Sequence, residues 1–171
     1  MMTNKQERFE ALVRAYHADL YRYAYWLSQQ KSVAEDLVQD TFLRAWKGLD
    51  QLLDTRQAKS WLITILRREN ARRFERKQFD YQDTAEDILF DDDQLTAEQL
   101  AEQRTIRRHI MQLPLEYREP LLLQLILGMT GEEIAVVLSM NLNTANTRLF
   151  RARQQLKERL DNPAHGGHRY G

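Results

Sequence analysis

The sequence predicts an all-α fold made of two small helical domains joined by an acidic linker. Six glycines and three prolines interrupt 171 residues, and long stretches repeat apolar side chains every three or four positions. This spacing places the apolar side chains on one face of a helix. The length suits one medium domain or two small ones, because a typical domain holds roughly 100 to 150 residues.

Three helices are expected in the first domain, which we place at residues 1–77. An amphipathic stripe from Phe9 to Leu27 predicts the first helix. For the second helix, Ser32 is a candidate N-cap, and Glu35 three residues later is its capping-box partner. The third helix is expected over residues 58–77, with the apolar positions Trp61, Leu62, Ile65, Leu66 and Phe74.

Charge is balanced over the whole chain, at 25 basic and 25 acidic residues, but it is segregated along it. Residues 56–77 hold eight Lys or Arg residues against two Glu, so the third expected helix is basic. Residues 78–103 hold nine acidic residues and no basic one, which predicts a linker. Any case for nucleic-acid binding therefore depends on where the charges lie.

The second domain is expected over residues 104–160, followed by a flexible tail at 161–171. Pro114 separates a helix over 104–113 from the next one, which Pro120 should start or kink. A short helix over 131–138, a break at 139–143 and a longer helix from Thr144 have the spacing of a helix-turn-helix. The expected packing positions of the two helices are Glu133, Ile134, Ala135 and Leu138, then Ala145, Leu149, Ala152 and Leu156.

The longer helix of this pair carries the candidate DNA contacts. Asn143 or Thr144 can cap it, leaving its N-terminus free to enter a major groove. The candidates for base contacts are Asn143, Asn146, Thr147 and Arg148, and those for phosphate contacts are Arg151 and Arg153. Thr144 belongs to the same predicted DNA-binding set. The alternative is a helical hairpin with a solvated basic face.

Enzymatic and membrane functions find little support in the sequence. The chain has no cysteine, four scattered histidines, no H-E-x-x-H or P-loop motif, and no apolar run long enough to span a bilayer. Apolar residues at 43% and charged residues at 29% are ordinary for a folded protein. We expect a soluble intracellular protein without catalytic residues, metal, cofactor, small-molecule substrate or membrane insertion.

Two separate blocks of sequence resemble the extracytoplasmic function sigma factors, a branch of the bacterial sigma-70 family. The segment EEIAVVLSMNLNTANTRLFRARQQLKERL is similar to the family's DNA-binding region, and Leu113, Pro114 and Arg118 match the motif before it. The segment AEDLVQDTFLRAWKGL is similar to the polymerase-binding helix, and AKSWLITILRRENARRFERK to the promoter-melting helix. The resemblance implies a cytoplasmic bacterial protein that directs core RNA polymerase to promoter DNA.

For the polymerase, the resemblance implies that the second helix docks on a coiled coil of the largest subunit. The matching outward residues are Asp36, Gln39, Asp40 and Arg44. Acidic groups suit a basic partner surface. The alternative is a solvated face with a local pair between Asp40 and Arg44, four residues apart.

For the promoter, the resemblance implies that the third helix and the loop at 50–57 bind the minus 10 element and capture a flipped base. That step needs a pocket and cationic contacts to the backbone. The matching residues are Lys59, Trp61, Arg67, Arg68, Arg72, Arg73 and Arg76. Trp61 either stacks on a base or packs in the core, and its place in the apolar stripe favours the core.

The resemblance also implies an anti-sigma factor as a partner that occludes the polymerase-binding surfaces. The linker is either a mimic of a phosphate backbone inside the polymerase or a plain spacer. The chain departs from the family pattern at Arg68 and Arg72, where Asn and Asp are often found, and at Ser139, where a turn glycine is common. It also has Gly131 where an aromatic residue is frequent, and Asn146 in place of a common lysine.

Two other functions remain open from the sequence. A stand-alone helix-turn-helix regulator would usually be a dimer that reads paired half-sites, but it leaves the acidic second helix unexplained. A helical interaction protein that never touches DNA is disfavoured by the two basic helices.

Overall fold

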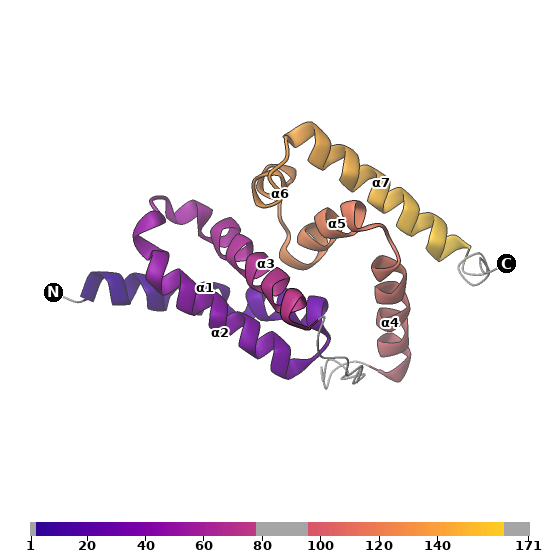
Figure 1. Cartoon of the computed structure of the whole chain (residues 1–171). Coiled ribbons are helices and arrows are strands. Elements are labelled where there is room, and N and C mark those ends of the chain that lie inside the picture. Colours follow the sequence, from indigo (N-terminus) through magenta and orange to yellow (C-terminus); the bar gives the residue numbers. More distant parts are fainter. Residues whose placement is uncertain (1–2, 78–95, 163–171) are drawn as a thin grey trace. The chain divides into compact units, whose positions relative to one another are not determined.

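The computed structural model describes residues 3–77 and 96–162, and every secondary-structure element within them is a helix (Figure 1). The chain divides into two compact units, Met1–Ile88 and Leu89–Gly171. The predicted all-α fold is confirmed. The expected linker residues 78–95 and tail residues 163–171 lie outside the described residues.

Unit one is built from three helices that pack against one another: α1 (Thr3–Ser28), α2 (Lys31–Gly48) and α3 (Ala58–Lys77). Short 3-10 turns at Leu49–Gln51 and Thr55–Gln57 connect α2 to α3. The largest fully buried side chains of this unit are Leu20, Tyr23, Leu37, Leu49, Leu62, Ile63 and Leu66. In α3 the core residues lie in the first half, whereas Phe74 is 61% exposed, so the second half is left for charged side chains.

The connection between α1 and α2 differs from the expected one. Helix α2 begins at Lys31 after Gln30, which has an extended backbone and makes no side-chain cap. Gln29 takes a left-handed conformation with φ of 61°, so the chain reverses within two residues and enters α2 before Ser32. The prediction of Ser32 as N-cap was therefore wrong.

Unit two contains α4 (Ala97–Met111), α5 (Leu115–Leu127), α6 (Gly131–Val137) and α7 (Leu142–Asp161). Helix α7 packs against each of the other three. The core of unit two includes Ile110, Leu121, Leu122, Leu123, Met129, Ile134, Ala145 and Leu149.

Residues 97–103, which were expected in the linker, belong to α4. Thr96 and Gln99 form a capping box, in which the Gln99 amide donates to Thr96 Oγ1 at 3.2 Å and the Thr96 amide donates to Gln99 Oε1 at 3.0 Å. These bonds satisfy two amides that a helix start otherwise leaves unpaired. The acidic composition hid this helix start, although Glu98 in the first turn suits the positive end of the helix dipole.

Helix α5 starts at Leu115, directly after Pro114, so Pro120 does not start it. The Pro114 carbonyl accepts hydrogen bonds from the amides of Tyr117 and Arg118, at 3.0 and 2.9 Å. Pro120 lies inside the helix and is buried, where it removes the hydrogen bond that an amide would donate to Glu116.

Two left-handed residues shape the helix-turn-helix. Gly128 follows α5 with φ of 62°, a conformation that glycine adopts without cost. Ser139 follows α6 with φ of 54°, and the next amide, of Met140, donates to the Ala135 carbonyl at 2.9 Å. The turn therefore has the geometry that favours glycine, although serine occupies it.

Replacing Ser139 with glycine should stabilise unit two by about 0.5 to 1 kcal/mol. A Cβ in the left-handed region costs about 1 to 2 kcal/mol, and the larger chain entropy of glycine offsets part of the gain. Hydrogen exchange of the α6 and α7 amides in the full chain measures the change. Ser139→Ala keeps the Cβ and serves as the control, and equal protection in all three proteins would argue against strain at this turn.

Candidate polymerase and DNA interfaces

The start of α7 positions the candidate DNA-reading residues. Its N-cap is Asn141, whose Oδ1 accepts a hydrogen bond from the Thr144 amide at 2.8 Å. The prediction of Asn143 or Thr144 as the cap was wrong. The chain turns at the left-handed Ser139, so the break between the two helices is shorter than the expected 139–143 and α7 begins at Leu142. Asn143 and Thr144 instead lie in the first turn of the helix.

The packed face of α7 determines which side chains remain outside. Ala145, Leu149 and Ala152 are buried, and Leu156 is half-buried against the cluster of Leu113, Leu121 and Ala152. The first helix of the pair buries Ile134, Ala135 and Val137, whereas Leu138 is half-buried. Glu133 makes a capping box with Thr130, with bonds of 3.1 and 3.2 Å.

The candidate contacts on α7 differ in exposure. Asn143, Asn146, Thr147 and Arg151 are exposed, whereas Thr144 and Arg148 are half-buried at the edge of the packed face. Arg153 is exposed and donates a hydrogen bond to Gln124 Oε1 of α5. Sequence reasoning missed Phe150, which is 69% exposed and lies three residues after Thr147 on the exposed side. Its position outside the apolar stripe of Ala145, Leu149 and Ala152 could have identified it from the sequence as an exposed aromatic residue.

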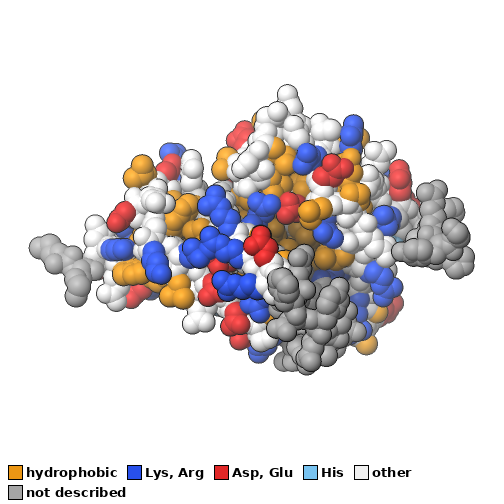
Figure 2. All heavy atoms as spheres, viewed as in Figure 1, with side chains coloured by type: hydrophobic (Ala, Val, Ile, Leu, Met, Phe, Trp, Pro, Cys, Tyr) orange, Lys and Arg blue, Asp and Glu red, His pale blue; other side chains and the backbone are white. Residues whose placement is uncertain are grey.

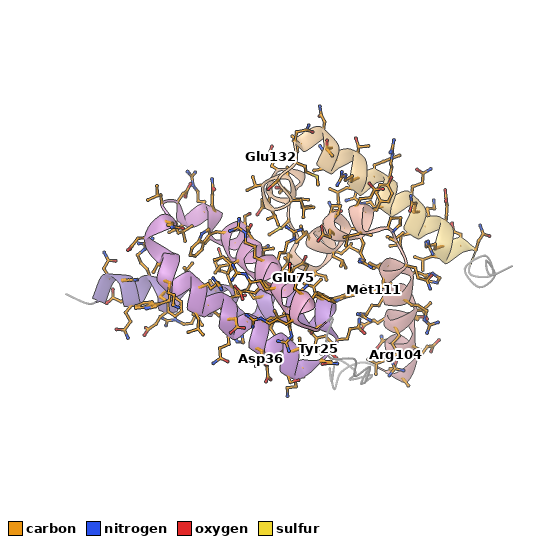
Figure 3. All side chains as sticks on the ribbon, viewed as in Figure 1. Tyr25, Asp36, Glu75, Arg104, Met111 and Glu132 are labelled. Atoms are coloured by element: carbon orange, nitrogen blue, oxygen red, sulfur yellow. The ribbon has the colours of Figure 1, made fainter. Side chains whose placement is uncertain are left out.

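In unit one, the predicted polymerase-binding residues lie on the outer side of α2. Asp36, Gln39 and Asp40 are exposed, while the opposite face buries Ala34, Leu37 and Ala45 (Asp36 is labelled in Figure 3). Arg44 is exposed too, and it pairs with Glu69 of α3. The expected local pair between Asp40 and Arg44 is not among the ion pairs of residues 3–77, where Arg44 pairs with Glu69 instead. Binding of polymerase by this face stays a prediction.

Glu69 is the centre of an ion-pair group that joins α2 to α3. Its side chain is only 10% exposed, and it pairs with both Arg44 and Arg72, the latter at 3.3 Å. Another pair joins the same two helices, in which the Nη1 of Arg73 lies 3.9 Å from the Oδ2 of Asp36 on α2. Two of the cations assigned to the minus 10 element are therefore already paired with acids of unit one.

The remaining cations of the basic helix differ in exposure. Arg68 and Arg76 are exposed, and Lys59 and Arg67 are half-buried. On the face drawn in Figure 2, Lys and Arg side chains gather over α3 with acidic side chains among them. The Nε of Arg73 is buried and makes no hydrogen bond within the described residues.

The loop before α3 is ordered by an aspartate and an arginine. Asp54 caps the second 3-10 turn, accepting from the Arg56 amide at 2.9 Å and from its guanidinium at 3.2 Å. These hydrogen bonds from Arg56 hold the pKa of Asp54 below its usual value. Leu53 beside it is 94% exposed. Trp61 is half-buried against Leu12, Leu49, Leu52 and Ala58, which is the core placement that its stripe favours.

A groove of about 390 Å³ lies between α1 and α2, beside the acidic face. Phe9 contacts Trp46 edge-on at 5.2 Å between ring centroids, and His17 stacks on Phe42 at 6.2 Å. Burial, and to a lesser degree Glu35, raises the pKa of Tyr21. Sequence reasoning did not identify this groove, which is lined by Phe9, Val13, His17, Tyr21, Glu35, Val38, Gln39, Phe42, Leu43 and Trp46.

No helix within residues 3–77 and 96–162 combines the length and apolar character needed to cross a bilayer. The same residues contain no group of three or more His, Asp or Glu side chains placed to hold a metal ion.

Comparisons with known proteins assign both units. Residues 12–80 match the family model for sigma-70 region 2, and residues 103–156 match the model for sigma-70, region 4. The RNA polymerase sigma factor YlaC of Bacillus subtilis is 26% identical over 162 residues, covering 91% of this chain and 93% of the relative. The ECF RNA polymerase sigma factor SigM of the same organism is 31% identical over 153 residues, covering 86% and 92%.

Two solved structures are similar in fold. One is CnrH in complex with the cytosolic domain of CnrY, with a TM-score of 0.68, 26% identity, and coverage of 93% of this chain and 91% of that one. The other is the sigma factor RpoE in complex with the anti-sigma factor NepR from Bartonella quintana, with a TM-score of 0.67, 25% identity, and coverage of 93% and 98%.

Two sigma-70 regions in this order define a transcription initiation factor. The chain belongs to the extracytoplasmic function branch of the sigma-70 family. It is an alternative sigma factor, which directs core RNA polymerase to specific promoters.

Replacing Glu69 with glutamine should lower the free energy of unfolding of unit one by about 1 to 2 kcal/mol. Glutamine keeps one acceptor oxygen, but it removes the negative charge that two arginines share. All three tryptophans of the chain, Trp26, Trp46 and Trp61, lie in unit one, so their fluorescence during urea unfolding reports on this unit. Glu75→Gln, an exposed position on the same helix, is the control and should change stability by less than about 0.5 kcal/mol. Equal effects of the two substitutions would show that the Glu69 pairs contribute little.

Proposed function

We propose that unit one binds core polymerase and the minus 10 element, and that unit two binds the minus 35 element. One observation carries this proposal. Each unit buries one stripe of its key helix and leaves the matched residues on the other side, acidic on α2 and polar or basic on α7. Residues 78–95 would link the unit that binds polymerase to the unit that binds the minus 35 element.

The acidic side of α2 is the proposed contact with the coiled coil of the largest polymerase subunit. Asp36, Gln39 and Asp40 face solvent, and the groove beside them offers an apolar surface. A basic amphipathic helix would satisfy both, because its cations meet the carboxylates while its apolar residues cover the aromatic rings. Arg44, which is paired with Glu69, takes part in the same contact.

The loop at 50–57 and the basic helix α3 are the proposed contacts with the minus 10 element. Arg68 and Arg76 are exposed and have no ion pair among residues 3–77, so they can reach phosphates. Arg72 and Arg73 must first leave Glu69 and Asp36 or act from within those pairs. Lys59 and Arg67 are half-buried on the same helix. Trp61 acts as a support for the loop from its packed position, not as a stacking platform.

The first two turns of α7 are the proposed reading surface for the minus 35 element. Asn143, Asn146 and Thr147 present amide and hydroxyl groups of the kind that contact base edges in a major groove. Arg148 lies at the edge of this surface, with Thr144 beside it. Arg151 is placed for phosphate contact, and Arg153 can reach phosphate after leaving Gln124.

The contribution of this protein to transcription is energetic. It supplies sequence-specific contacts and stabilises a melted strand, while the polymerase carries out nucleotidyl transfer, so we assign no catalytic residue or cofactor. We propose that it works in the bacterial cytoplasm. The CnrH and RpoE structures contain CnrY and the anti-sigma factor NepR, and a comparable inhibitor that covers the α2 face and the adjoining groove is proposed for this chain.

Run-off transcription with purified core polymerase on a library of promoter fragments tests the proposal. Promoter-specific start sites that require this protein support it. Duplex binding by the protein alone in a two-fold footprint would instead favour a stand-alone helix-turn-helix regulator.

Asp40→Arg should weaken binding to core polymerase by tenfold or more, because it places a cation opposite the basic partner surface, on the order of 1.4 kcal/mol or more. Asp40 is exposed and makes no ion pair among the described residues, so the fold should not change. Fluorescence anisotropy of the labelled protein titrated with core polymerase measures the affinity. Glu7→Arg, an exposed reversal on α1, is the control. Unchanged affinity of a folded Asp40→Arg protein would remove this face from the interface.

Arg148→Ala should impair promoters that depend on a minus 35 element more than those that do not. A lost base contact costs about 1 to 3 kcal/mol and is specific to sequence. Arg151→Ala is the matched control, since losing a phosphate contact should weaken all promoters alike and reduce the salt dependence. Sequencing of run-off products from the promoter library gives both profiles, and an unaltered Arg148→Ala profile would remove Arg148 from the reading set.

A further inference from the structure

The side chain of Asn146 on α7 lies directly over Gly131, the first residue of α6. A Cβ placed on Gly131 would overlap Asn146 Oδ1, and it would lie 3.4 Å from both Asn146 Cγ and Leu142 Cδ1. Glu132, the next residue, marks this end of α6 in Figure 3. The amide of Asn146 thus occupies the space that any other side chain at 131 would need.

Glycine at 131 supplies space and not backbone freedom. Among the described glycines only Gly128 has a positive φ, so the backbone at Gly131 suits any L residue. Gly131 is also the first residue of α6, where Thr130 already caps the helix. Nothing in the local backbone therefore requires glycine here, and what it permits is the close approach of Asn146.

The conformation of Asn146 matters because the side chain is exposed on the reading side of α7. The direction of an asparagine amide depends on χ2, which has a broad distribution, so contacts with neighbouring atoms can set it. A Cβ at 131 excludes the observed position of Asn146 Oδ1, so the amide, as the end of a flexible side chain, must turn aside. An asparagine amide contacts adenine through a pair of hydrogen bonds whose geometry depends on that direction.

We propose that Gly131 is a specificity-determining position: by lacking a side chain, it lets the Asn146 amide lie across the start of α6 and so sets which base pair of the minus 35 element Asn146 discriminates. Gly131 acts as a positioning residue, because it works through Asn146 and not by touching DNA. The inference rests on the proposed role of α7 in reading that element. It also joins two departures from the family pattern, at 131 and 146, in one contact.

The test is a double-mutant cycle in the holoenzyme, with Gly131→Ala, Asn146→Ala and the double variant. Each is assembled with core polymerase and transcribes a library randomised across the minus 35 element, and run-off products are sequenced. Gly131→Ala should change the preference at one base pair by roughly fivefold or more, and Asn146→Ala should change the preference at the same base pair. The double variant should match Asn146→Ala alone.

Gly48→Ala is the matched control, because a Cβ at that glycine meets no atom nearer than 3.7 Å, and its minus 35 profile should equal that of the unmodified protein. A second readout is the NMR signal of the Asn146 side-chain amide in the free protein, which should move in Gly131→Ala and stay in place in Gly48→Ala. A thermal unfolding transition of Gly131→Ala close to that of the parent shows that the variant is folded, so that a changed minus 35 profile reports on Asn146.

The outcomes separate this inference from the proposed function. If the unmodified protein directs no promoter-specific transcription, or does so without using the minus 35 element, the proposed function fails. If it does use that element, but the effects of the two substitutions simply add, fall on different base pairs or alter all sequences equally, then the link between Gly131 and Asn146 is refuted.

Discussion

Burial of one narrow apolar stripe on each helix decides which side chains remain available to partners. In α7 the buried residues Ala145, Leu149 and Ala152 fix the rotation of the helix about its axis, which places Asn143 and Thr147 outside. A rotation by one residue, about 100°, would carry these side chains off the exposed face. The same constraint on α2 leaves its acidic residues on the solvent side. Packing is therefore what arranges the two candidate interfaces.

The charges of unit one form a second constraint, because the α2 and α3 faces share ion-pair partners. Glu69 pairs with Arg44, assigned to polymerase, and with Arg72, assigned to DNA, while Asp36 lies beside Arg73. Groups in one network are not energetically independent. Substitutions on either face should thus affect the other, which is why Asp40, outside this network, is the better probe of polymerase binding.

The sequence was sufficient for the fold class and for the bounds of α3, because both follow from apolar periodicity. It failed at the N-caps Gln30 and Asn141, since each follows a left-handed residue, Gln29 or Ser139, by one or two positions. Helical content at 97–103 was hidden by acidic composition. The ion pairs between helices and the groove between α1 and α2 depend on how two helices pack against each other. The apolar pattern of a single helix does not contain this information.

Balanced charge limits how this protein can find DNA. With 25 basic and 25 acidic residues, the chain gains little long-range attraction to a duplex from its net charge. Its cationic groups act only at short range, within a screening length of roughly 8 to 10 Å. Within unit one, Glu69 and Asp36 reduce that field further by pairing with Arg72 and Arg73. Under the proposed roles, docking of α2 on the polymerase would bring the cations within this range of the promoter, so that specificity depends on local contacts made by an already positioned protein.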